Sequence, residues 1–390
     1  MRIVVDENVP QAQAFARHGE LVRLPGRSLR AADVRDADAL IVRSITRVNA
    51  ELLEGSRVGF VGTCTIGVDH LDTEWLEQQG IAWSNAPGCN ARSVVEYVLA
   101  ALRRLALQRQ SSLAQRCYGI VGAGEVGQRL ANVLRALGWQ VVLCDPPRAA
   151  GGRAPVVESP VGQSFVDIDE LIARCDVICL HTPLTTSGAW PTRHLLDEER
   201  LRRLRPDCWL VNAGRGPVID NQALLAVLQE RDDLAVALDV WEHEPLVDPR
   251  LAARCALVTP HIAGYSLDGK IRGTEMIYQA FCRHFALDAG EGVSYPLAEI
   301  THLGVGDGVT AEQLLCRLSV LFYDPLADDA ALRATLGLDA QGRGEAFDRL
   351  RKQYPVRREM PATSVQLPAD AVALQQVARA LGMPWQVAGR

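Results

Sequence analysis

The stretch Cys117-Tyr-Gly-Ile-Val-Gly-Ala-Gly-Glu-Val-Gly-Gln-Arg-Leu130 decides the fold. A short apolar run precedes its glycines, and the pattern after them is that of an amphipathic helix. In such a strand, turn and helix, Gly122 allows a tight turn and Gly124 lets the backbone approach a pyrophosphate. Gly127 lets the helix pack closely on the strand, so that the helix N-terminus faces the phosphates. The stretch therefore predicts a dinucleotide site.

The next apolar run, residues 140–144, ends in Asp145. A carboxylate at this point suits the ribose hydroxyls of NAD and would repel the additional phosphate of NADP. The glycines alone would also fit a turn without a ligand. Because a strand, a helix and an acid accompany them, we expect NAD to be the cofactor.

Composition excludes several classes of protein. The chain has 390 residues and a net charge of −6, which predicts two or three domains and disfavours nucleic-acid binding. Its ten cysteines form no CxxC pair, which indicates buried thiols in a reducing compartment. The apolar run at the N-terminus is too short for a signal peptide, and no run is long enough to span a membrane. We therefore expect a cytoplasmic protein.

Two other kinds of chemistry are excluded by motif. Lysine occurs only at Lys270 and Lys352, neither in a GxxxxGK setting, so there is no P-loop. His243-Glu244 lacks the second histidine of an HExxH motif, and we expect no metal.

Short apolar runs alternate with helical patterns along most of the chain, which predicts parallel sheets with crossover helices. The predicted strands are 2–5, 39–43, 58–62, 81–84, 117–121, 140–144, 176–180, 209–212, 234–238 and 256–258. Long helical patterns begin near Asn90 and Ser266, and residues 146–162 are predicted to be a loop. The fold class is therefore α/β, with two Rossmann-like doubly wound sheets and a smaller C-terminal α+β accessory domain.

We expect three domains. Residues 1–92 with 262–289 form an outer, substrate-binding domain, residues 93–261 an NAD-binding Rossmann domain, and residues 290–390 the accessory domain. The locally basic segment 343–358 is interpreted as a solvated face or a subunit contact rather than an anion site.

Polar turns follow the strands of the second sheet, and ligands bind at that edge of a parallel sheet. A nicotinamide enzyme needs a cation for the substrate, a group that exchanges the hydroxyl proton, and a group that orients it. Arg215 suits a carboxylate and the adjacent oxygen, and His261 can take the proton. Glu244 would bond the other ring nitrogen of His261 and raise its basicity.

Four motifs resemble, in order and spacing, those of the D-isomer-specific 2-hydroxyacid dehydrogenases. They are the glycine turn, Asn-Ala-Gly-Arg215-Gly, Asp239-Val-Trp-Glu-His-Glu244-Pro and Thr-Pro-His261-Ile-Ala-Gly. The resemblance implies that Arg215 and Glu244 are catalytic and that His261 exchanges the proton. It also implies that the cofactor is contacted by the glycines and by Glu125, Val126, Asp145, Thr182, Ala213, Asp239 and Gly264.

A narrower resemblance, to one branch of that family, rests on Val42-Arg-Ser-Ile-Thr-Arg47, on 62–70, on 264–274 and on the additional C-terminal region. It implies NAD-dependent oxidation of a phosphorylated 2-hydroxy acid, 4-phospho-D-erythronate, in vitamin B6 biosynthesis. The implied substrate contacts are Ser44, Thr65 and Tyr265, and the tail would form a homodimer. Because Arg43 and Arg47 flank Ser44, we expect at least one of them to neutralise the phosphate.

Three alternatives remain open at this stage. A D-3-phosphoglycerate dehydrogenase acts on a similar substrate, but its usual turn after the histidine differs from Ala263-Gly-Tyr-Ser266. An NAD-sensing corepressor shares the fold and the three catalytic residue types, although the polar residues near Ser44 indicate a substrate cleft rather than a peptide surface. The third alternative is an inactive NAD-binding scaffold. Loss of Arg215 or His261 would favour it, but the sequence has both residues.

Overall fold

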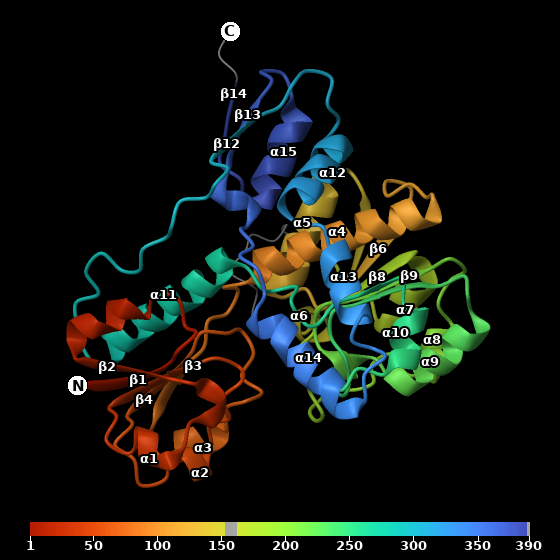
Figure 1. Ribbon diagram of the computed structural model, residues 1–390. Helices are drawn as coiled ribbons and strands as arrows, with labels where there is room; N and C mark the ends of the chain where they lie inside the picture. Colours follow the sequence, from red (N-terminus) through yellow and green to blue (C-terminus); the bar gives the residue numbers. More distant parts are fainter. Residues whose placement is uncertain (153–161, 388–390) are drawn as a thin grey trace. The chain divides into compact units, whose positions relative to one another are not determined.

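The computed structural model describes residues 1–152 and 162–387 (Figure 1). The chain divides into two compact units. The first consists of Met1–Asn90 with Ser266–Leu297, and the second of Ala91–Tyr265 with Ala298–Arg390. Each unit is built on its own parallel sheet, which confirms the predicted α/β class.

The sheet of the first unit has five parallel strands in the order β2-β1-β3-β4-β5. Their bounds are Arg2–Asp6 (β1), Glu20–Leu24 (β2), Ala39–Val42 (β3), Phe60–Thr63 (β4) and Ala82–Ser84 (β5). The apolar runs of β1, β3 and β4 are buried because helices cover both faces of the sheet. Strand β2 was not predicted, because it lies at the sheet edge and its polar residues remain exposed.

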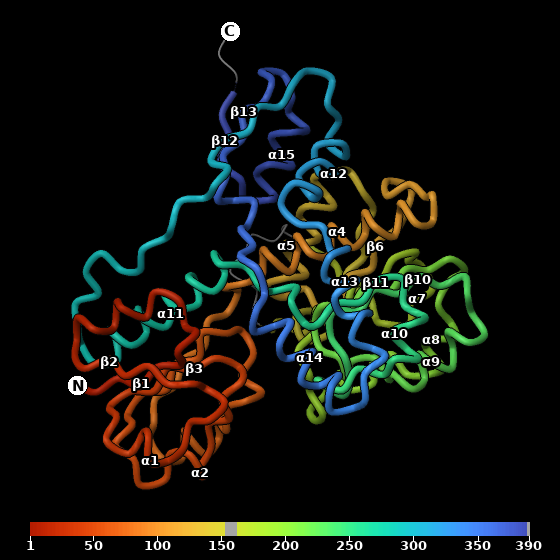
Figure 2. The backbone as a smooth tube through the Cα atoms, in the orientation of Figure 1, coloured from red at the N-terminus to blue at the C-terminus, as the bar shows by residue number. Residues whose placement is uncertain are grey.

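Helices and 3-10 turns cover both faces of this sheet. One face packs against η1 (Ala12–His18) and α11 (Leu267–His284), and the other against α1 (Ala31–Val34), α2 (Ala50–Leu53) and α3 (Thr73–Gln78). The short turn η2 spans Gly26–Ser28. Figure 2 shows α11 beside the first strands although it lies far along the chain. Phe281 of α11 packs edge-on against Phe15 and Phe60, which fixes this return of the chain.

The sheet of the second unit has six parallel strands in the order β11-β10-β9-β8-β6-β7. Their bounds are Cys117–Val121 (β6), Gln140–Cys144 (β7), Val177–Leu180 (β8), Trp209–Asn212 (β9), Ala235–Leu238 (β10) and Leu257–Val258 (β11). The strand order reverses beside β6, since β7 lies on one side of it and β8 on the other. This point, at the carboxyl ends of the strands, is where doubly wound sheets bind their ligands.

Helices cover both faces of the second sheet as well. The first face carries α4 (Ala91–Arg109) and α5 (Glu125–Ala136). The second carries α7 (Ile168–Arg174), α8 (Glu198–Arg202), α9 (Asn221–Glu230) and α10 (Pro249–Arg254). Two short elements, α6 (Pro146–Ala149) and η3 (Gly216–Val218), follow β7 and β9.

The tail forms a small parallel sheet in the order β12-β13-β14, together with four helices. The elements are β12 (His302–Gly304), α12 (Ala311–Phe322), α13 (Leu326–Arg333), α14 (Ala340–Lys352), η4 (Met360–Ala362), β13 (Ser364–Leu367), α15 (Val372–Leu381) and β14 (Trp385–Val387). Helix α15 packs on α5 and α12 packs on α4, as the blue and orange segments of Figure 2 show. Leu318 and Leu381 thus share one core with Leu102 and Leu130.

The division into three domains stays a prediction.

Helix α13 of the tail covers the edge of the six-stranded sheet. Asp329 Oδ1 accepts a hydrogen bond of 2.8 Å from the backbone N–H of Val258, in the edge strand β11. The guanidinium of Arg333 donates to the carbonyls of Ala252 and Cys255 and pairs with Asp329. Backbone groups that an edge strand would expose are therefore satisfied within the chain.

One prediction about local structure is wrong. The predicted loop 146–162 contains helix α6, because Asp145 Oδ1 accepts from Arg148 N and the prolines that follow suit the first helical turn. Residues 153–161 of that loop lie outside the described residues. The segment 343–358, expected to be a solvated face or a subunit contact, includes Arg357, which is buried and donates to the carbonyls of Ser93 and Ala263. Its role as a subunit contact stays a prediction.

The glycine turn has the geometry that its sequence predicts. Gly122 has a φ of +87°, and a Cβ there would lie 2.9 Å from backbone atoms of His181 and Thr182. A Cβ on Gly127 would overlap the carbonyl oxygen of Gly122. A Cβ on Gly124 would meet no atom within 4 Å. Two glycines are therefore required by packing, whereas Gly124 leaves open space.

Replacing Gly127 with alanine is expected to lower the free energy of unfolding by about 2 kcal/mol, because helix α5 must move away from the turn. The matched control is Gly124→Ala, whose methyl group enters open space and should leave stability within about 0.5 kcal/mol. Urea unfolding of both variants without added cofactor measures the difference. Equal stability of the two variants would contradict the close packing at Gly127.

Candidate active site

Arg215 lies in the turn after β9, and the turn is fixed by the side chain of Asn212. Asn212 Nδ2 donates to the carbonyl of Arg215 at 3.0 Å, and its Oδ1 accepts from Gly214 N at 3.1 Å. A Cβ on Gly216 would overlap the backbone of Trp241, so the turn after β9 packs directly on the turn after β10. The sequence analysis did not assign Asn212 a role, although a buried polar residue at the end of a strand is the signal for one.

Glu244 and His261 form the hydrogen bond that the sequence analysis predicts. His261 Nδ1 lies 2.7 Å from Glu244 Oε2, and Glu244 Oε1 accepts from the backbone N–H of Trp241 at 2.9 Å. Burial opposes ionisation of Glu244, but the His261 ring, these hydrogen bonds and the charge of Arg351 outweigh it and lower the pKa of the carboxyl group. Glu244 is therefore an anion at neutral pH that orients the ring and leaves Nε2 for proton exchange.

Asp239 holds the loop that carries His261. Its carboxylate, which is 1% exposed, accepts from Ile262 N at 2.8 Å, Ala263 N at 2.9 Å and Thr259 Oγ1 at 2.6 Å. Its carbonyl accepts from His261 N at 2.7 Å, although His261 has a left-handed φ of +56°. Such a conformation costs about 1–2 kcal/mol, which these bonds offset. The predicted contact of Asp239 with the cofactor stays a prediction.

A buried hydroxyl pair extends this network into helix α4. Tyr97 Oη lies 2.8 Å from Thr259 Oγ1, and Thr259 in turn donates to Asp239. Burial raises the pKa of Tyr97, so its phenol stays protonated and can donate. Sequence reasoning missed this pair, because nothing local links a tyrosine of α4 to a turn so distant in the sequence.

The residues around the glycine turn fit NAD. Thr182 Oγ1 and both ring nitrogens of His181 are buried and have no hydrogen-bond partner within residues 1–152 and 162–387. They follow β8 at the switch point, beside Gly122. Gly124 leaves room for a pyrophosphate at the first turn of α5, where no side chain caps the helix. Polar groups without partners beside such a space are what a bound dinucleotide satisfies.

The other predicted cofactor residues lie in the same unit. Asp145 ends β7, and its carboxylate accepts from Ala123 N at 2.8 Å and from Arg148 N. Glu125 and Val126 form the first turn of α5, where Glu125 pairs with Arg129 at 2.6 Å. Ala213 follows β9 and Gly264 lies in the loop after β11. Their direct contacts with NAD remain predictions.

The predicted substrate residues of the first unit follow two neighbouring strands. Ser44 comes after β3, and Thr65, after β4, bonds Thr63 Oγ1 at 2.8 Å. Arg43 Nε lies 3.1 Å from Asp6 Oδ1, and Asp6 is fully buried, so the charge of Arg43 is already paired. Arg47 is exposed. Tyr265 belongs to the other unit.

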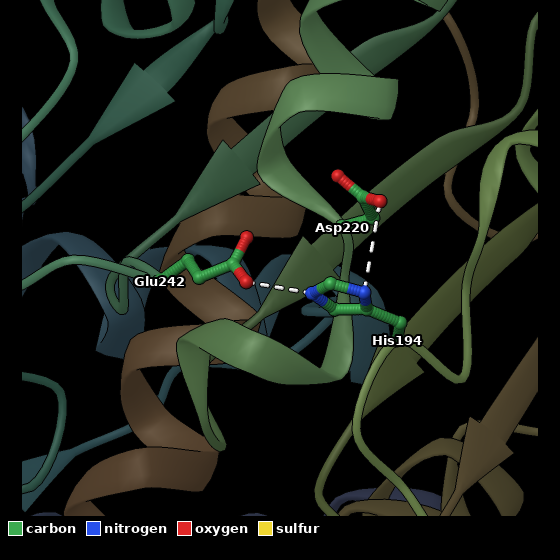
Figure 3. A group of neighbouring side chains, drawn as sticks. All are labelled: His194, Asp220 and Glu242. Carbon is green, nitrogen blue, oxygen red and sulfur yellow. Dashed lines mark hydrogen bonds and ion pairs between the residues drawn. The ribbon is translucent and has the colours of Figure 1, made fainter.

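His194 lies between the carboxylates of Asp220 and Glu242 (Figure 3). Its Nε2 is 2.6 Å from Glu242 Oε1, and its Nδ1 is 3.6 Å from Asp220 Oδ2. Glu242 also accepts from Asn221 N at 3.1 Å. Because the carboxylates approach different ring nitrogens, one metal ion could not bind all three residues as they stand. The cluster instead connects Glu242, in the turn that carries Glu244, with Asn221, which follows the turn of Arg215.

A dinucleotide-binding sheet with an arginine, a histidine and a glutamate at its carboxyl edge is typical of an NAD-dependent dehydrogenase. Residues 97–263 match the model of the D-isomer specific 2-hydroxyacid dehydrogenase NAD binding domain. The chain is 53% identical to an erythronate-4-phosphate dehydrogenase from Azotobacter vinelandii, over 98% of this chain and 99% of the relative. It is 54% identical to one from Pseudomonas syringae pv. syringae, with the same coverage. The chain belongs to the erythronate-4-phosphate dehydrogenases of the D-isomer specific 2-hydroxyacid dehydrogenase family.

Solved structures support the same fold. An NAD-bound 3-phosphoglycerate dehydrogenase from Entamoeba histolytica has a TM-score of 0.62 and 23% identity, and covers 76% of this chain and 99% of its own. A D-lactate dehydrogenase from Aquifex aeolicus with NAD and lactic acid has a TM-score of 0.60 and 23% identity, and covers 76% and 100%. Residues 295–382 match a domain of unknown function. The predicted enzyme class and NAD as cofactor are confirmed.

His181 is expected to make the stability of the folded chain depend on pH. Its burial lowers the pKa of the ring to about 4, whereas an unfolded histidine titrates near pH 6.5. The unfolded chain therefore binds the proton more readily than the folded chain. The contribution of His181 to the free energy of unfolding is fully present above pH 6.5 and is lost as the pH falls toward 4. The contribution of His181 to this loss should reach about 3 kcal/mol.

We expect His181→Phe to remove that contribution, so that its stability falls less steeply than that of the unmodified chain between pH 6.5 and 4. Urea unfolding at a series of pH values measures both curves. Parallel curves would show that His181 is not held as a neutral ring in the folded state.

Proposed function

We propose that the chain oxidises 4-phospho-D-erythronate at its 2-hydroxyl group with NAD, giving (R)-3-hydroxy-2-oxo-4-phosphooxybutanoate, in the biosynthesis of pyridoxal 5'-phosphate. The Glu244–His261 hydrogen bond beside the turn of Arg215 is the observation that carries the proposal. The names of relatives that match along nearly the full chain support this choice of substrate.

The residues of the second unit divide the work. When bound, NAD supplies the ring that accepts the hydride from carbon 2. Arg215 holds the carboxylate and the adjacent oxygen through its planar guanidinium. His261 Nε2 takes the hydroxyl proton, and the ionised Glu244 stabilises the imidazolium that forms. Asp239 keeps the His261 loop in place during the transfer.

The test is turnover with NAD and 4-phospho-D-erythronate, followed by absorbance of the reduced cofactor, with a 2-oxo acid present to recycle bound cofactor. We expect turnover with this four-carbon acid and little with D-3-phosphoglycerate. Glu244→Gln should reduce kcat about 100-fold or more, because the ring of His261 loses its orienting anion. Faster turnover of D-3-phosphoglycerate, or none of either acid, would contradict the proposal.

We also propose a cytoplasmic homodimer whose subunits each contain the three predicted domains. All ten cysteines are free thiols, and most are buried, as a reducing compartment permits. None of the described helices is both long and apolar enough to cross a membrane. The tail exposes Leu321, Leu338 and Val356 in the single chain, and a second copy would cover such residues.

Sedimentation equilibrium at micromolar concentration should give twice the mass of one chain. Val356, which is 76% exposed, is the residue to change. We expect Val356→Asp to weaken association without lowering the unfolding free energy of the single chain. A monomeric unmodified chain would refute the dimer.

A further inference from the structure

Arg351, on helix α14 of the tail, reaches the loop that carries the catalytic histidine. Its guanidinium carbon lies 5.6 Å from the ring centre of Tyr265 and 5.7 Å from that of Phe347. Tyr354 packs edge-on against Tyr265, with ring centres 5.7 Å apart. The position of Arg351 beside Tyr265 is therefore fixed by packing, all within the second unit.

The Arg351 guanidinium has no ion-pair partner within 4 Å in the described part of the chain, although its charge attracts Glu244 at longer range. Its Nε is buried and has no hydrogen-bond partner among these residues. Two other arginines of the tail are bonded within the chain, since Arg333 pairs with Asp329, and Arg357 donates to two carbonyls although its Nε is unpartnered too. A half-buried guanidinium without a hydrogen-bonded anion leaves its N–H donors available to an anionic ligand.

The charge of Arg351 also acts on the carboxylate that binds His261. Arg351 is close enough to Glu244 to contribute to the lowered pKa of that carboxyl group. Helix α14 lies in residues 295–382, outside the stretch 97–263 that matches the NAD-binding domain of the wider family. Arg351 is thus an addition to the shared machinery of Arg215, Glu244 and His261.

We propose that Arg351 binds the phosphate group of the substrate. The proposal rests on the proposed function, whose substrate carries a carboxylate for Arg215 and a second anion that needs its own cation. A guanidinium matches phosphate with two parallel hydrogen bonds. Of the arginines first expected to do this, Arg43 is already paired with buried Asp6. Arg351 has a guanidinium Nε that no described residue bonds, and such a donor suits this task.

The experiment compares the unmodified chain with Arg351→Met, using 4-phospho-D-erythronate and unphosphorylated D-erythronate. We expect the KM for the phosphorylated acid to rise about 10- to 100-fold with little change in kcat, because charged hydrogen bonds are lost. The KM for D-erythronate should stay the same, and Arg351→Lys should restore part of the loss. The matched control is Arg349→Met, an exposed arginine on the same helix, which should behave as the unmodified chain.

Inorganic phosphate provides a readout that does not need turnover. It should raise the Tm of the unmodified chain and of Arg349→Met, but not that of Arg351→Met. An unchanged KM, equal losses for both acids, or the same phosphate-dependent rise in Tm for Arg351→Met would overturn the inference. If the unmodified chain does not oxidise 4-phospho-D-erythronate, the proposed function fails, and the phosphate titration still decides whether Arg351 binds phosphate.

Discussion

The buried carboxylate of Asp239 is the interaction on which the rest of the site depends. It accepts three hydrogen bonds from the loop between Thr259 and Ala263 in a setting where water cannot replace them. These bonds keep His261 in a left-handed conformation and place Nδ1 against Glu244. Glu244 and His261, the predicted catalytic pair, are thus positioned by bonds within the chain, and such preorganisation lowers the cost of reorganisation in an enzyme reaction.

Around this centre, neighbouring turns support one another. Because Gly216 has no side chain, the turn of Arg215 packs directly on the backbone of Trp241. The next residue, Glu242, forms a hydrogen bond with His194. The tail adds a further layer, since Arg357 holds the carbonyl of Ala263 and Tyr354 holds the ring of Tyr265. A region that the sequence separates from the active site therefore helps to build it.

The sequence was sufficient for those features that local patterns determine. Apolar runs predicted the central strands, the glycines predicted the turn, and the acid at Glu244 was correctly paired with His261. It was insufficient where partners lie far apart. Nothing in the sequence near Tyr97 or Arg357 indicates that the first bonds Thr259 and the second Ala263, because tertiary packing alone brings them together. Helix α14 was likewise missed, since its charged composition shows only a narrow apolar face.

The shared core of α5 and α15 has a consequence for synthesis in the cell. Leu130 leaves the ribosome long before Leu381 has been made, yet both belong to the same buried cluster. The apolar surface of α5 that packs against α15 therefore stays uncovered until α15 has been synthesised. A chain truncated before α15 would expose that surface permanently, which makes it a substrate for chaperones and proteases rather than a smaller enzyme.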